Sequence, residues 1–418
     1  RNMDLFKLFS EGFIDIKKNL ILKNLKIKKK KKKKIFSKKA SFFKEEIRRE
    51  IIEKYDEKFV LGGTTTTARR QEMSYARVGV VGCGHLGKIH ARLLAGRDDC
   101  TLVGVVDPIS DVASAVAEIH NCESYSEPED LVGRVDAAVV AAPTGLHAKV
   151  AIPLLEAGID LLVEKPIAAS VEDARAIVVT ARRYGRVVAV GHVERFNPAW
   201  ALACQQPGKP LFIESARLAP FTYRSLDVGV VFDLMIHDID LVLSLQPGRL
   251  ENIESDGIVA TGGHEDVVKA RLTFGSGLVA DLMASRINPV LSRQLSMWTT
   301  ETMVSVDFNA KTVGVVAASE EVATGRFVAD SVPLGERVVA KDSFFQDVLP
   351  HQTLPVPDSN AIVSEHDDFL RARADGVEPR VSASAGSAAL EVATRVLDVL
   401  KCTKLGAPPA IMGIRKSA

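Results

Sequence analysis

A glycine-rich turn between an apolar run and a helical pattern constrains this chain more than any other feature. Residues 77–81 read Arg-Val-Gly-Val-Val, a short β-branched run that predicts a buried strand. The turn, residues 82–87, reads Gly-Cys-Gly-His-Leu-Gly and follows at once, and residues 89–95 have the apolar spacing of a helix. A GxGxxG turn that joins a strand to a helix is typical of a βαβ unit.

Each glycine of the turn has a separate physical role. Gly82 permits the tight turn, Gly84 lets the backbone approach a pyrophosphate, and Gly87 lets the helix pack close to the strand. The N-terminus of the helix offers free N–H groups and a positive dipole end to phosphates. We therefore expect these glycines, with His85 and Leu86, to bind a dinucleotide; the alternative is a tight turn that binds nothing.

An acidic residue stands at the position that the dinucleotide interpretation requires. Residues 101–106 predict a second strand, which ends at Asp107, 25 positions after Gly82. A carboxylate there can accept hydrogen bonds from the adenosine ribose, whereas a 2′-phosphate would meet a like charge. No arginine follows directly, since residues 108–110 read Pro-Ile-Ser. The pattern favours NAD over NADP, and the alternative is an exposed aspartate at a strand end.

Strands and helices continue to alternate after the turn. This alternation predicts a doubly wound parallel sheet with helices on both faces, a Rossmann-type domain over residues 73–192. The predicted strands cover residues 136–141, 160–163 and 187–190, and the predicted helices cover residues 147–157 and 171–184.

Two further loops follow strands of this sheet, at the edge where open α/β sheets bind ligands. Residues 142–147 read Ala-Pro-Thr-Gly-Leu-His, in which Thr144 can simply cap the next helix. Residues 164–166 read Glu-Lys-Pro and place a cation at this edge. Lys165 could orient a substrate hydroxyl or help to move its proton, or it could be an ordinary solvated lysine.

An acid–base candidate lies in the second half of the chain. Asp233 and His237 are four residues apart in an apolar helical stretch, residues 230–245, and so are expected to share one helix face. A carboxylate one turn away can fix the tautomer of the imidazole, and a neutral imidazole can accept a hydroxyl proton. The alternatives for His237 are a core histidine, a capping residue, or a metal ligand together with Asp238 or Asp240.

The combination of the glycine turn, Pro143-Thr144-x-x-His147 and Glu164-Lys165-Pro166 resembles the Gfo/Idh/MocA family of oxidoreductases. The resemblance implies an N-terminal Rossmann domain and a C-terminal α/β domain with a large open, mainly antiparallel sheet. It implies a catalytic role for Lys165 and cofactor contacts for Pro143, Thr144, His147 and Glu164. It also implies that His237, paired with Asp233, is the base in an NAD-dependent oxidation, which needs no metal.

Residues 191–198, 217–221 and 227–240 are similar to the family branch that contains UDP-N-acetylglucosamine 3-dehydrogenases. This similarity implies oxidation of a sugar C3 hydroxyl to a ketone. The diphosphate of a nucleotide sugar needs cationic partners, so Arg195 and Arg217 are candidate substrate contacts. Asn197, in the same segment as Arg195, is a further candidate substrate contact. The alternatives are a dehydrogenase of a free polyol or hexose such as inositol, and a cofactor-binding regulator without activity.

The part after residue 250 predicts short strands joined by turns. Together with residues 193–250 they are expected to form a second domain, 193–405, whose last helix returns to the first domain. One sheet face should cover the helix with His237, and the other should pair with a second subunit in a homodimer or homotetramer. Residues 317–358 are expected to be a long loop, because they contain four prolines. The predicted strands cover residues 267–274, 278–285, 294–298, 303–307 and 312–316, and the predicted helices cover residues 361–374 and 384–401.

Charge separates a third segment from these two domains. Residues 1–72 carry 22 Lys and Arg against 10 Asp and Glu, including seven consecutive lysines, whereas the rest of the chain has a net charge of −11. We expect residues 1–72 to be a disordered extension; the alternatives are a targeting segment and a patch for nucleic acid or a membrane surface. The folded part has no basic cluster for nucleic acid.

The five cysteines and the apolar runs limit the environment of the chain. No cysteine pair has CxxC spacing, which argues against a zinc site or a disulfide framework. No apolar run approaches about 18 residues, so a transmembrane helix is not expected. The expected location is the reducing cytoplasm.

Overall fold

The computed structural model describes residues 75–223 and 226–405. All of them belong to one compact unit, Glu72–Ala418. The basic segment, residues 1–72, lies outside the described residues.

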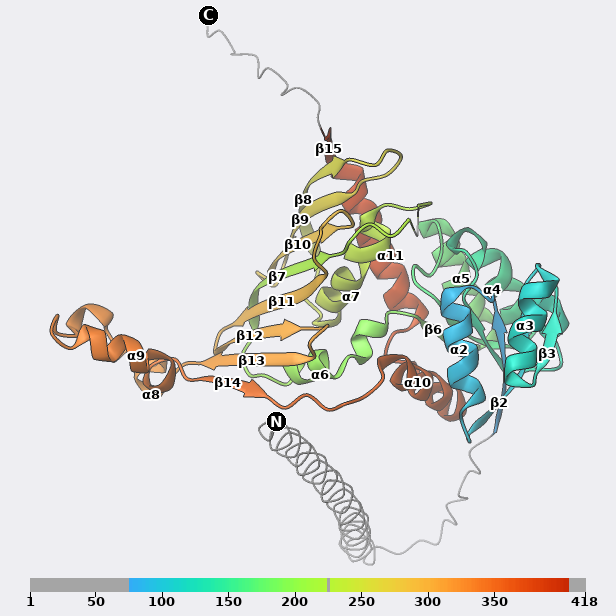
Figure 1. Cartoon of the computed structure of the whole chain (residues 1–418), viewed down its shortest axis with the longest axis horizontal. Helices are drawn as coiled ribbons and strands as arrows, with labels where there is room; N and C mark the ends of the chain where they lie inside the picture. Colours follow the sequence, from blue (N-terminus) through green and yellow to red (C-terminus); the bar gives the residue numbers. More distant parts are fainter. Residues whose placement is uncertain (1–74, 224–225, 406–418) are drawn as a thin grey trace, which may run out of the picture. The chain divides into compact units, whose positions relative to one another are not determined.

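The first half of the described chain forms a six-stranded sheet in the order β3-β2-β1-β4-β5-β6 (Figure 1). All of its strand pairs are parallel. Because β1 lies inside the sheet and the chain winds outward from it in both directions, this is the predicted doubly wound fold. The strands are β1 (Ala76–Val81), β2 (Cys100–Val106), β3 (Glu123–Tyr125), β4 (Ala137–Val140), β5 (Asp160–Val163) and β6 (Val188–Val190), and the helices are α2 (His85–Ala95), α3 (Ser110–His120), α4 (His147–Glu156) and α5 (Val171–Tyr184), with short 3₁₀ turns η1 (Pro128–Leu131) and η2 (Thr144–Leu146).

Local sequence explains these elements well. Every residue of β4 and β5 is buried, as expected for parallel strands covered by helices on both faces. Helix α5 begins at Ser170, whose hydroxyl accepts from the N–H of Asp173 over 3.1 Å. It ends at Gly185, which has a positive φ of 61°. Local patterns therefore placed most elements of this half, but helix α3 and the short strand β3 were not predicted.

A second sheet of nine strands, in the order β14-β13-β12-β11-β7-β10-β9-β8-β15, forms the other layer of the protein. It is mainly antiparallel, with parallel pairing only for β7 with β10 and for β8 with β15. This confirms the predicted fold class. The strands are β7 (Pro210–Leu218), β8 (Leu250–Val259), β9 (Val267–Phe274), β10 (Val279–Ser285), β11 (Ser292–Thr299), β12 (Thr302–Asp307), β13 (Thr312–Ala317), β14 (His351–Leu354) and β15 (Lys401–Lys404).

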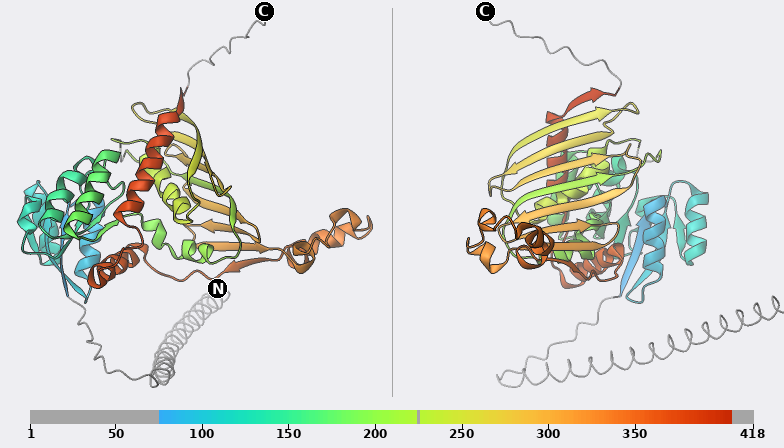
Figure 2. Two further views of the ribbon diagram at one scale, coloured as in Figure 1. Left: turned by 180° about the vertical axis from the view of Figure 1, so that it is seen from behind. Right: turned by 60° about the vertical axis from the view of Figure 1, so that its left-hand side comes forward.

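Helices cover one face of this sheet (Figure 2). They bury a large apolar cluster against alternate strand residues such as Leu282, Val304 and Val306. The elements on this side include η3 (Val193–Phe196), α6 (Pro198–Cys204), the π-helical turn η4 (Val231–Met235), α7 (Ile236–Ser244), α10 (Ala361–Asp375) and α11 (Ala383–Val399).

The opposite face carries a row of apolar side chains, here called the outer row. Strand register aligns Val279, Phe212, Trp298, Met303 and Val316 across five neighbouring strands. All five are half-buried, and the rings of Phe212 and Trp298 lie 5.4 Å apart. This apolar surface is what a second subunit would require.

The prediction of a long loop over residues 317–358 was wrong. This segment contains α8 (Glu320–Ala323), the 3₁₀ turn η5 (Ala329–Ser331), α9 (Arg337–Asp347) and β14. The prolines lie between these elements: Pro350 directly precedes β14 and Pro355 directly follows it. These prolines mark the ends of the helices and strands but do not prevent them from forming. Strands β7 and β8 were also not predicted, since their charged residues and glycine are uncommon in strands.

Helix α11 contacts both halves of the unit. It packs against α5 and β6 on one side and against α7 and β8 on the other. The N–H of Val190 donates to the carbonyl of Val381, just before α11, over 2.9 Å. A Cβ on Gly386 would lie 2.7 Å from the Val190 side chain, so glycine permits this close approach. The contact fixes the end of the Rossmann sheet relative to the second sheet.

Candidate active site

The glycine turn has a backbone that needs glycine at two positions. Gly82 has a φ of 95°, and its N–H donates to the carbonyl of Val106 over 2.8 Å. A Cβ on Gly87 would lie 1.7 Å from the Gly82 carbonyl oxygen, so only glycine lets α2 begin this close to the turn. A Cβ on Gly84 would meet no protein atom within 4 Å. The space beside Gly84 is therefore open to a ligand.

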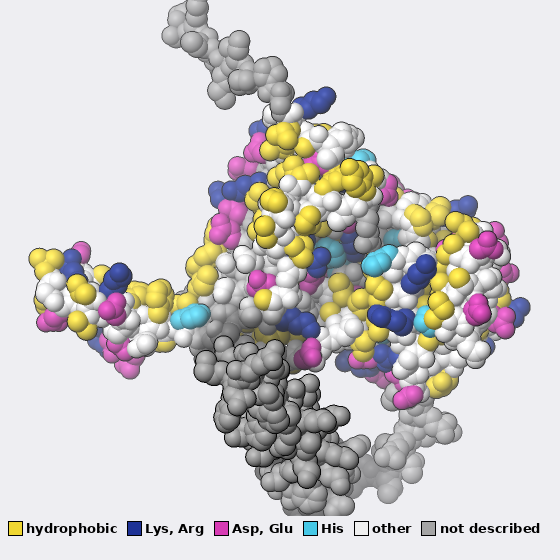
Figure 3. Space-filling view, viewed as in Figure 1, with side chains coloured by type: hydrophobic (Ala, Val, Ile, Leu, Met, Phe, Trp, Pro, Cys, Tyr) yellow, Lys and Arg dark blue, Asp and Glu magenta, His cyan; other side chains and the backbone are white. Residues whose placement is uncertain are grey.

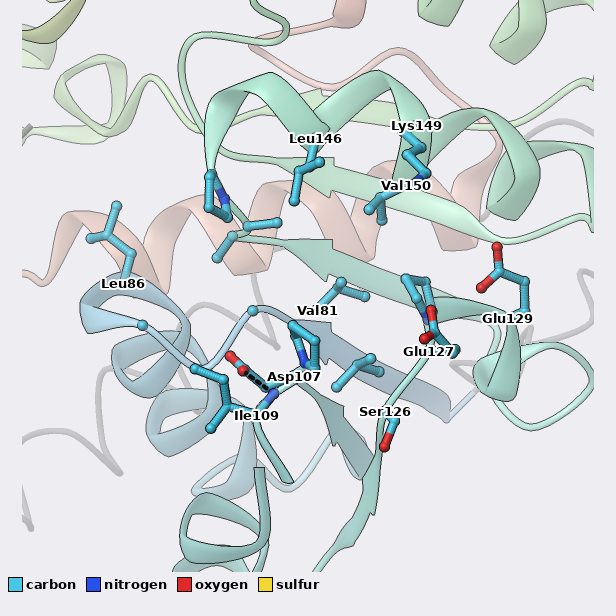
Figure 4. Close-up of a pocket in the computed structure, with 18 of the residues that line it drawn as sticks. Val81, Leu86, Asp107, Ile109, Ser126, Glu127, Glu129, Leu146, Lys149 and Val150 are labelled. Carbon is cyan, nitrogen blue, oxygen red and sulfur yellow. Dashed lines mark hydrogen bonds between the residues drawn. The ribbon is translucent and has the colours of Figure 1, made fainter. Parts of the chain in front are cut away.

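A cleft of about 690 Å³ lies beside the turn (Figure 4). Its walls come from the turn, the end of β2, the segment after β3 and the start of α4, and its volume suits an organic cofactor. Sequence reasoning did not predict the segment after β3, although a strand end was a signal for it. The lining residues include His85, Leu86, Asp107, Ile109, Glu127, Glu129, Pro143, Leu146 and Lys149.

Asp107 lies at the edge of this cleft and also supports the turn. Its Oδ2 accepts from the N–H of Cys83 over 2.9 Å, and its Oδ1 accepts from the N–H of Ile109 over 3.0 Å. Each carboxylate oxygen has a further lone pair, so both can still accept from a ribose hydroxyl. The carboxylate thus ties the turn to the end of β2 while facing the cleft.

These residues fit a dinucleotide. Among the described residues, no side chain caps the N-terminus of α2, so its first N–H groups are available to a phosphate. The unfilled space at Gly84 gives a pyrophosphate access to them.

Four of the predicted cofactor residues do not line the cleft: Gly87, Thr144, His147 and Glu164. The His147 side chain is buried, with Nδ1 2.8 Å from the Pro166 carbonyl and Nε2 2.9 Å from the Ala142 carbonyl. Burial lowers the pKa of His147, so the neutral ring donates to one carbonyl at a time. Its contacts join the loop of residues 142–147 to the loop of residues 164–166 inside the protein.

Lys165 lies against the second domain. Its Nζ donates to the backbone carbonyl of Asp233 over 2.7 Å and to the Asp233 carboxylate over 3.1 Å. The two side chains are 14% and 29% exposed, so the ion pair is partly open to a substrate. The tertiary structure thus joins the Glu-Lys-Pro loop to the segment that carries His237.

The predicted pairing of Asp233 with His237 was wrong. Asp233 lies in the π-helical turn η4, whereas His237 lies in α7, which follows it. Folding brings the Lys165 ammonium group, whose proximity helical spacing could not predict, within 3.1 Å of the Asp233 carboxylate. The Asp233 carboxylate faces Lys165, and the buried Nδ1 of His237 has no hydrogen-bond partner among the described residues.

His237 is nevertheless buried near positively charged side chains. Its pKa is well below the usual value, first because of burial and then because of the positive charges of Lys165, Arg217 and Arg293. The imidazole is therefore neutral at pH 7 and ready to accept a proton. The Lys165 charge therefore acts on the His237 ring, although the two residues belong to separate halves of the chain.

Two residues near His237 were not predicted. His192, directly after β6, is buried, and its ring lies 6.1 Å from that of His237. Neither of its ring nitrogens has a partner among the described residues, and burial lowers its pKa to about 3. Arg293 on β11 has its Nη1 3.7 Å from Oε1 of Glu194, and its charge is one of those that lower the pKa of His237. The position of His192 at a strand end was the only sequence signal for either residue.

Arg217 is enclosed by carboxylates. Its guanidinium is 3% exposed, donates to Asp238 over 2.8 Å through Nη2 and donates to Glu194 over 2.9 Å through Nη1. Asn197 donates to the same Glu194 and caps α6, where its Oδ1 accepts from the N–H of Ala199. Neither side chain offers the exposed polar group that a diphosphate would need, so the geometry favours a structural role for both.

Arg195 also pairs within the protein. Its Nη1 lies 3.3 Å from Asp240, and its Nη2 donates to the Arg380 carbonyl over 3.1 Å. Asp240 is 1% exposed, and burial raises its pKa to about 7 despite the pairing with Arg195. This carboxyl therefore binds a proton more tightly in the folded protein than in the unfolded chain.

Replacing Asp240 by asparagine is expected to remove a pH dependence of stability. The raised pKa gives a stabilisation that is complete below about pH 4 and is lost as the pH rises through 7, at up to about 1.4 kcal/mol per pH unit. Thermal melts at pH 5 and pH 8 should show a larger loss for the wild type than for D240N. An equal loss of melting temperature in both proteins would show that Asp240 is ionised at both pH values.

A second cleft of about 350 Å³ adjoins the same loops. Thr144 and Pro166 of the Rossmann half face Asp227, Phe232 and Glu265 of the second half across it. Space for a second molecule therefore exists next to the dinucleotide cleft. Figure 3 shows histidine and basic side chains in the hollow between the two halves.

The described residues contain no group of three or more His, Cys, Asp or Glu that could hold a metal ion. No helix in residues 75–223 and 226–405 is both long and apolar enough to cross a bilayer.

Comparison with known proteins gives a consistent family assignment. Residues 76–192 match the family described as "Oxidoreductase family, NAD-binding Rossmann fold", and residues 179–320 match the "GFO/IDH/MocA C-terminal domain". The chain is 36% identical over 244 residues to UDP-N-acetylglucosamine 3-dehydrogenase of Acidithiobacillus ferrooxidans, covering 58% of this chain and 77% of that protein. It is 29% identical to scyllo-inositol 2-dehydrogenase (NAD(+)) of Bacillus subtilis, covering 51% and 68%.

Solved structures agree with these matches. The Acidithiobacillus ferrooxidans enzyme superposes with a TM-score of 0.69 at 30% identity, covering 78% of this chain and 98% of that chain. Levoglucosan dehydrogenase in complex with NADH shares the fold, with a TM-score of 0.65 at 18% identity, covering 77% and 96%. The chain belongs to the Gfo/Idh/MocA family of oxidoreductases, enzymes that act on sugar hydroxyls, and its first domain is an NAD-binding Rossmann domain.

Proposed function

We propose that this protein oxidises the C3 hydroxyl of a UDP-N-acetylamino sugar to a ketone with NAD. The observation that supports the proposal is the ion pair of Lys165 with Asp233, four residues before His237, whose pKa the Lys165 charge lowers. The choice of sugar is supported by the 36% identity to UDP-N-acetylglucosamine 3-dehydrogenase.

The neutral imidazole of His237 is the proposed base. Oxidation of an alcohol removes the hydroxyl proton and a hydride from the same carbon, and NAD, when bound, supplies the acceptor for the hydride. His237 takes the proton, which a group with a depressed pKa can do at pH 7 because it is not already protonated.

Lys165 is proposed to donate a hydrogen bond to the same hydroxyl oxygen. Its ammonium group stabilises the negative charge that develops there as the proton leaves. Asp233 holds this ammonium group through both its carboxylate and its backbone carbonyl. Asp233 therefore acts on Lys165 and not on His237.

Two alternatives have specific support. Several relatives are inositol dehydrogenases, at 25–31% identity, so a free polyol is the second candidate substrate. A regulator without activity would not need the Lys165–Asp233 pair beside a proton-accepting His237, and the presence of all three argues for an enzyme.

The decisive experiment is to mix the purified protein with NAD and a panel of sugars and to follow NADH absorbance. We expect turnover with UDP-N-acetylglucosamine or a close UDP-amino sugar, and none with inositol. Turnover with inositol alone would replace the proposed substrate by a polyol. NAD binding without turnover on any sugar would favour the regulator.

We also propose that the protein is a homodimer or homotetramer in the cytoplasm, joined through the outer row. The unpaired buried thiols of Cys83 and Cys100 are in keeping with a reducing compartment. Burying five half-exposed apolar side chains supplies a driving force for association.

Replacing Trp298 by glutamate is therefore expected to shift the protein towards monomers. A charge at the centre of an apolar interface would be desolvated without a partner. Sedimentation velocity measures the assembly state, and Gln294→Glu on the same strand, an exposed position outside the row, serves as the control. An unchanged oligomer in W298E would place the interface elsewhere.

A further inference from the structure

A buried chain of hydrogen bonds lies behind Lys165, and the proposed reaction does not use it. His366 on α10 contacts His90 on α2, with Nε2 2.8 Å from Nδ1. His90 in turn contacts Glu164 at the end of β5, with Nε2 2.9 Å from Oε1. The other carboxylate oxygen of Glu164 accepts from the backbone N–H of Lys165 over 3.1 Å. The chain thus links three elements to the lysine.

The partners in this chain of hydrogen bonds determine which ring nitrogens carry a proton. A carboxylate only accepts, so His90 presents Nε2–H to Glu164 and keeps a lone pair on Nδ1. His366 must then donate its own Nε2–H to that lone pair. The Nδ1 of His366 is buried without a partner, and a lone pair is cheaper to leave unpaired there than an N–H. Burial also lowers the pKa of His366 to about 3, which keeps its ring neutral.

The carboxylate of Glu164 is closely confined. A Cβ on Gly191 would lie 2.8 Å from Glu164 Oε2, so the bare backbone of residue 191 forms one wall. Glu365, next to His366, is buried, and burial and the Glu164 charge raise its pKa well above the usual value. A protonated Glu365 adds no second negative charge. The position of Glu164 is therefore set by His90 and Gly191.

We propose that His90 and His366 are positioning residues for Lys165. The donor on His366 holds the His90 ring in place, His90 holds the Glu164 carboxylate, and the carboxylate holds the Lys165 backbone from which the ammonium group reaches Asp233. Partners one step removed from a reacting group set its orientation in this way. The inference rests on the proposed function for the role of Lys165, but the chain itself consists of contacts within the protein.

The test compares two substitutions of His366. The amide nitrogen of H366Q can still donate to His90 Nδ1, whereas H366L cannot, and the His90 ring is then no longer held from the side opposite Glu164. We expect H366L to lower kcat about 10- to 100-fold with little change in KM or in the Kd for NAD, and H366Q to recover most of the loss. Equal losses in both variants would overturn the proposal.

A second readout does not require a substrate. Lys165 in its pair with Asp233 should react slowly with acetic anhydride, and peptide mass spectrometry can follow its acetylation in the full chain. We expect faster acetylation of Lys165 in H366L than in the wild type, with H366Q close to the wild type. Unchanged acetylation in a folded H366L would show that the chain does not position the lysine.

Two further variants separate positioning from general stability. Asp367→Asn changes the neighbouring residue on the same helix, where the Asp367 carboxylate makes an exposed ion pair with Arg97, and should leave kcat and acetylation unchanged. G191A should push the Glu164 carboxylate away and reproduce the H366L effect. If the wild type oxidises no sugar but the acetylation pattern holds, the proposed function fails and the positioning chain stands.

Discussion

Replacing His237 by alanine is expected to lower kcat by about 10²- to 10⁴-fold while NAD still binds. The magnitude is that of a lost general base. The imidazole is neutral because of burial and the nearby Lys165 charge, so its ring has a lone pair that can take the hydroxyl proton. NADH absorbance measures turnover, and protein fluorescence with NAD measures cofactor binding.

His120, at the C-terminal end of α3, provides a matched control. Its replacement by alanine should leave both measurements unchanged, because α3 lies outside both clefts. An unchanged rate in H237A would remove His237 from the mechanism. Loss of both turnover and NAD binding would indicate a folding defect, and H237Q would then be used, because it preserves the volume of the side chain better.

The second large effect is expected from two single-methyl changes in the glycine turn. In G87A the new Cβ would lie 1.7 Å from the Gly82 carbonyl oxygen, so α2 must move away from the turn. Overpacking of this kind costs about 1–3 kcal/mol of unfolding free energy. In G84A the Cβ meets no protein atom, and φ is −69°, so the fold should be unaffected.

G84A and G87A should both weaken cofactor binding, but only G87A should also lose stability. The methyl of G84A occupies the space in which a pyrophosphate would approach the backbone, and we expect the Kd for NAD to rise about tenfold or more at unchanged stability. G87A should lose both stability and affinity. Calorimetry with NAD and thermal melts measure the two quantities. Normal NAD affinity in G84A would place the pyrophosphate elsewhere.

The sequence was most informative where the structure depends on neighbours along the chain. The glycine turn and the buried runs of β4 and β5 are local, and they predicted the fold of the Rossmann half, although α3 and β3 were missed. The family resemblance supplied the second sheet, which local patterns predicted only in part. Strand β7 was missed because it carries Arg217, whose charge is neutralised by Glu194 and Asp238 from distant elements.

The candidate site shows the same division. Helical spacing paired Asp233 with His237, but folding brings Lys165 of the first domain within 3.1 Å of the Asp233 carboxylate. The substrate contacts predicted at Arg195 and Arg217 also depended on residue type alone, and the fold gives both side chains internal carboxylate partners. A phosphate-binding arginine and a buried paired arginine look alike in a sequence.

The amino-acid sequence by itself determined the turn, the strands around it, the family, and the presence of a lysine and a histidine suited to the reaction. Only the tertiary structure decided which groups pair: Lys165 with Asp233, Glu164 with His90, and Arg217 with two carboxylates. The reason is physical. Hydrophobic periodicity and backbone freedom act over a few residues, whereas the partner of a charge is whichever group folding brings within about 3 Å.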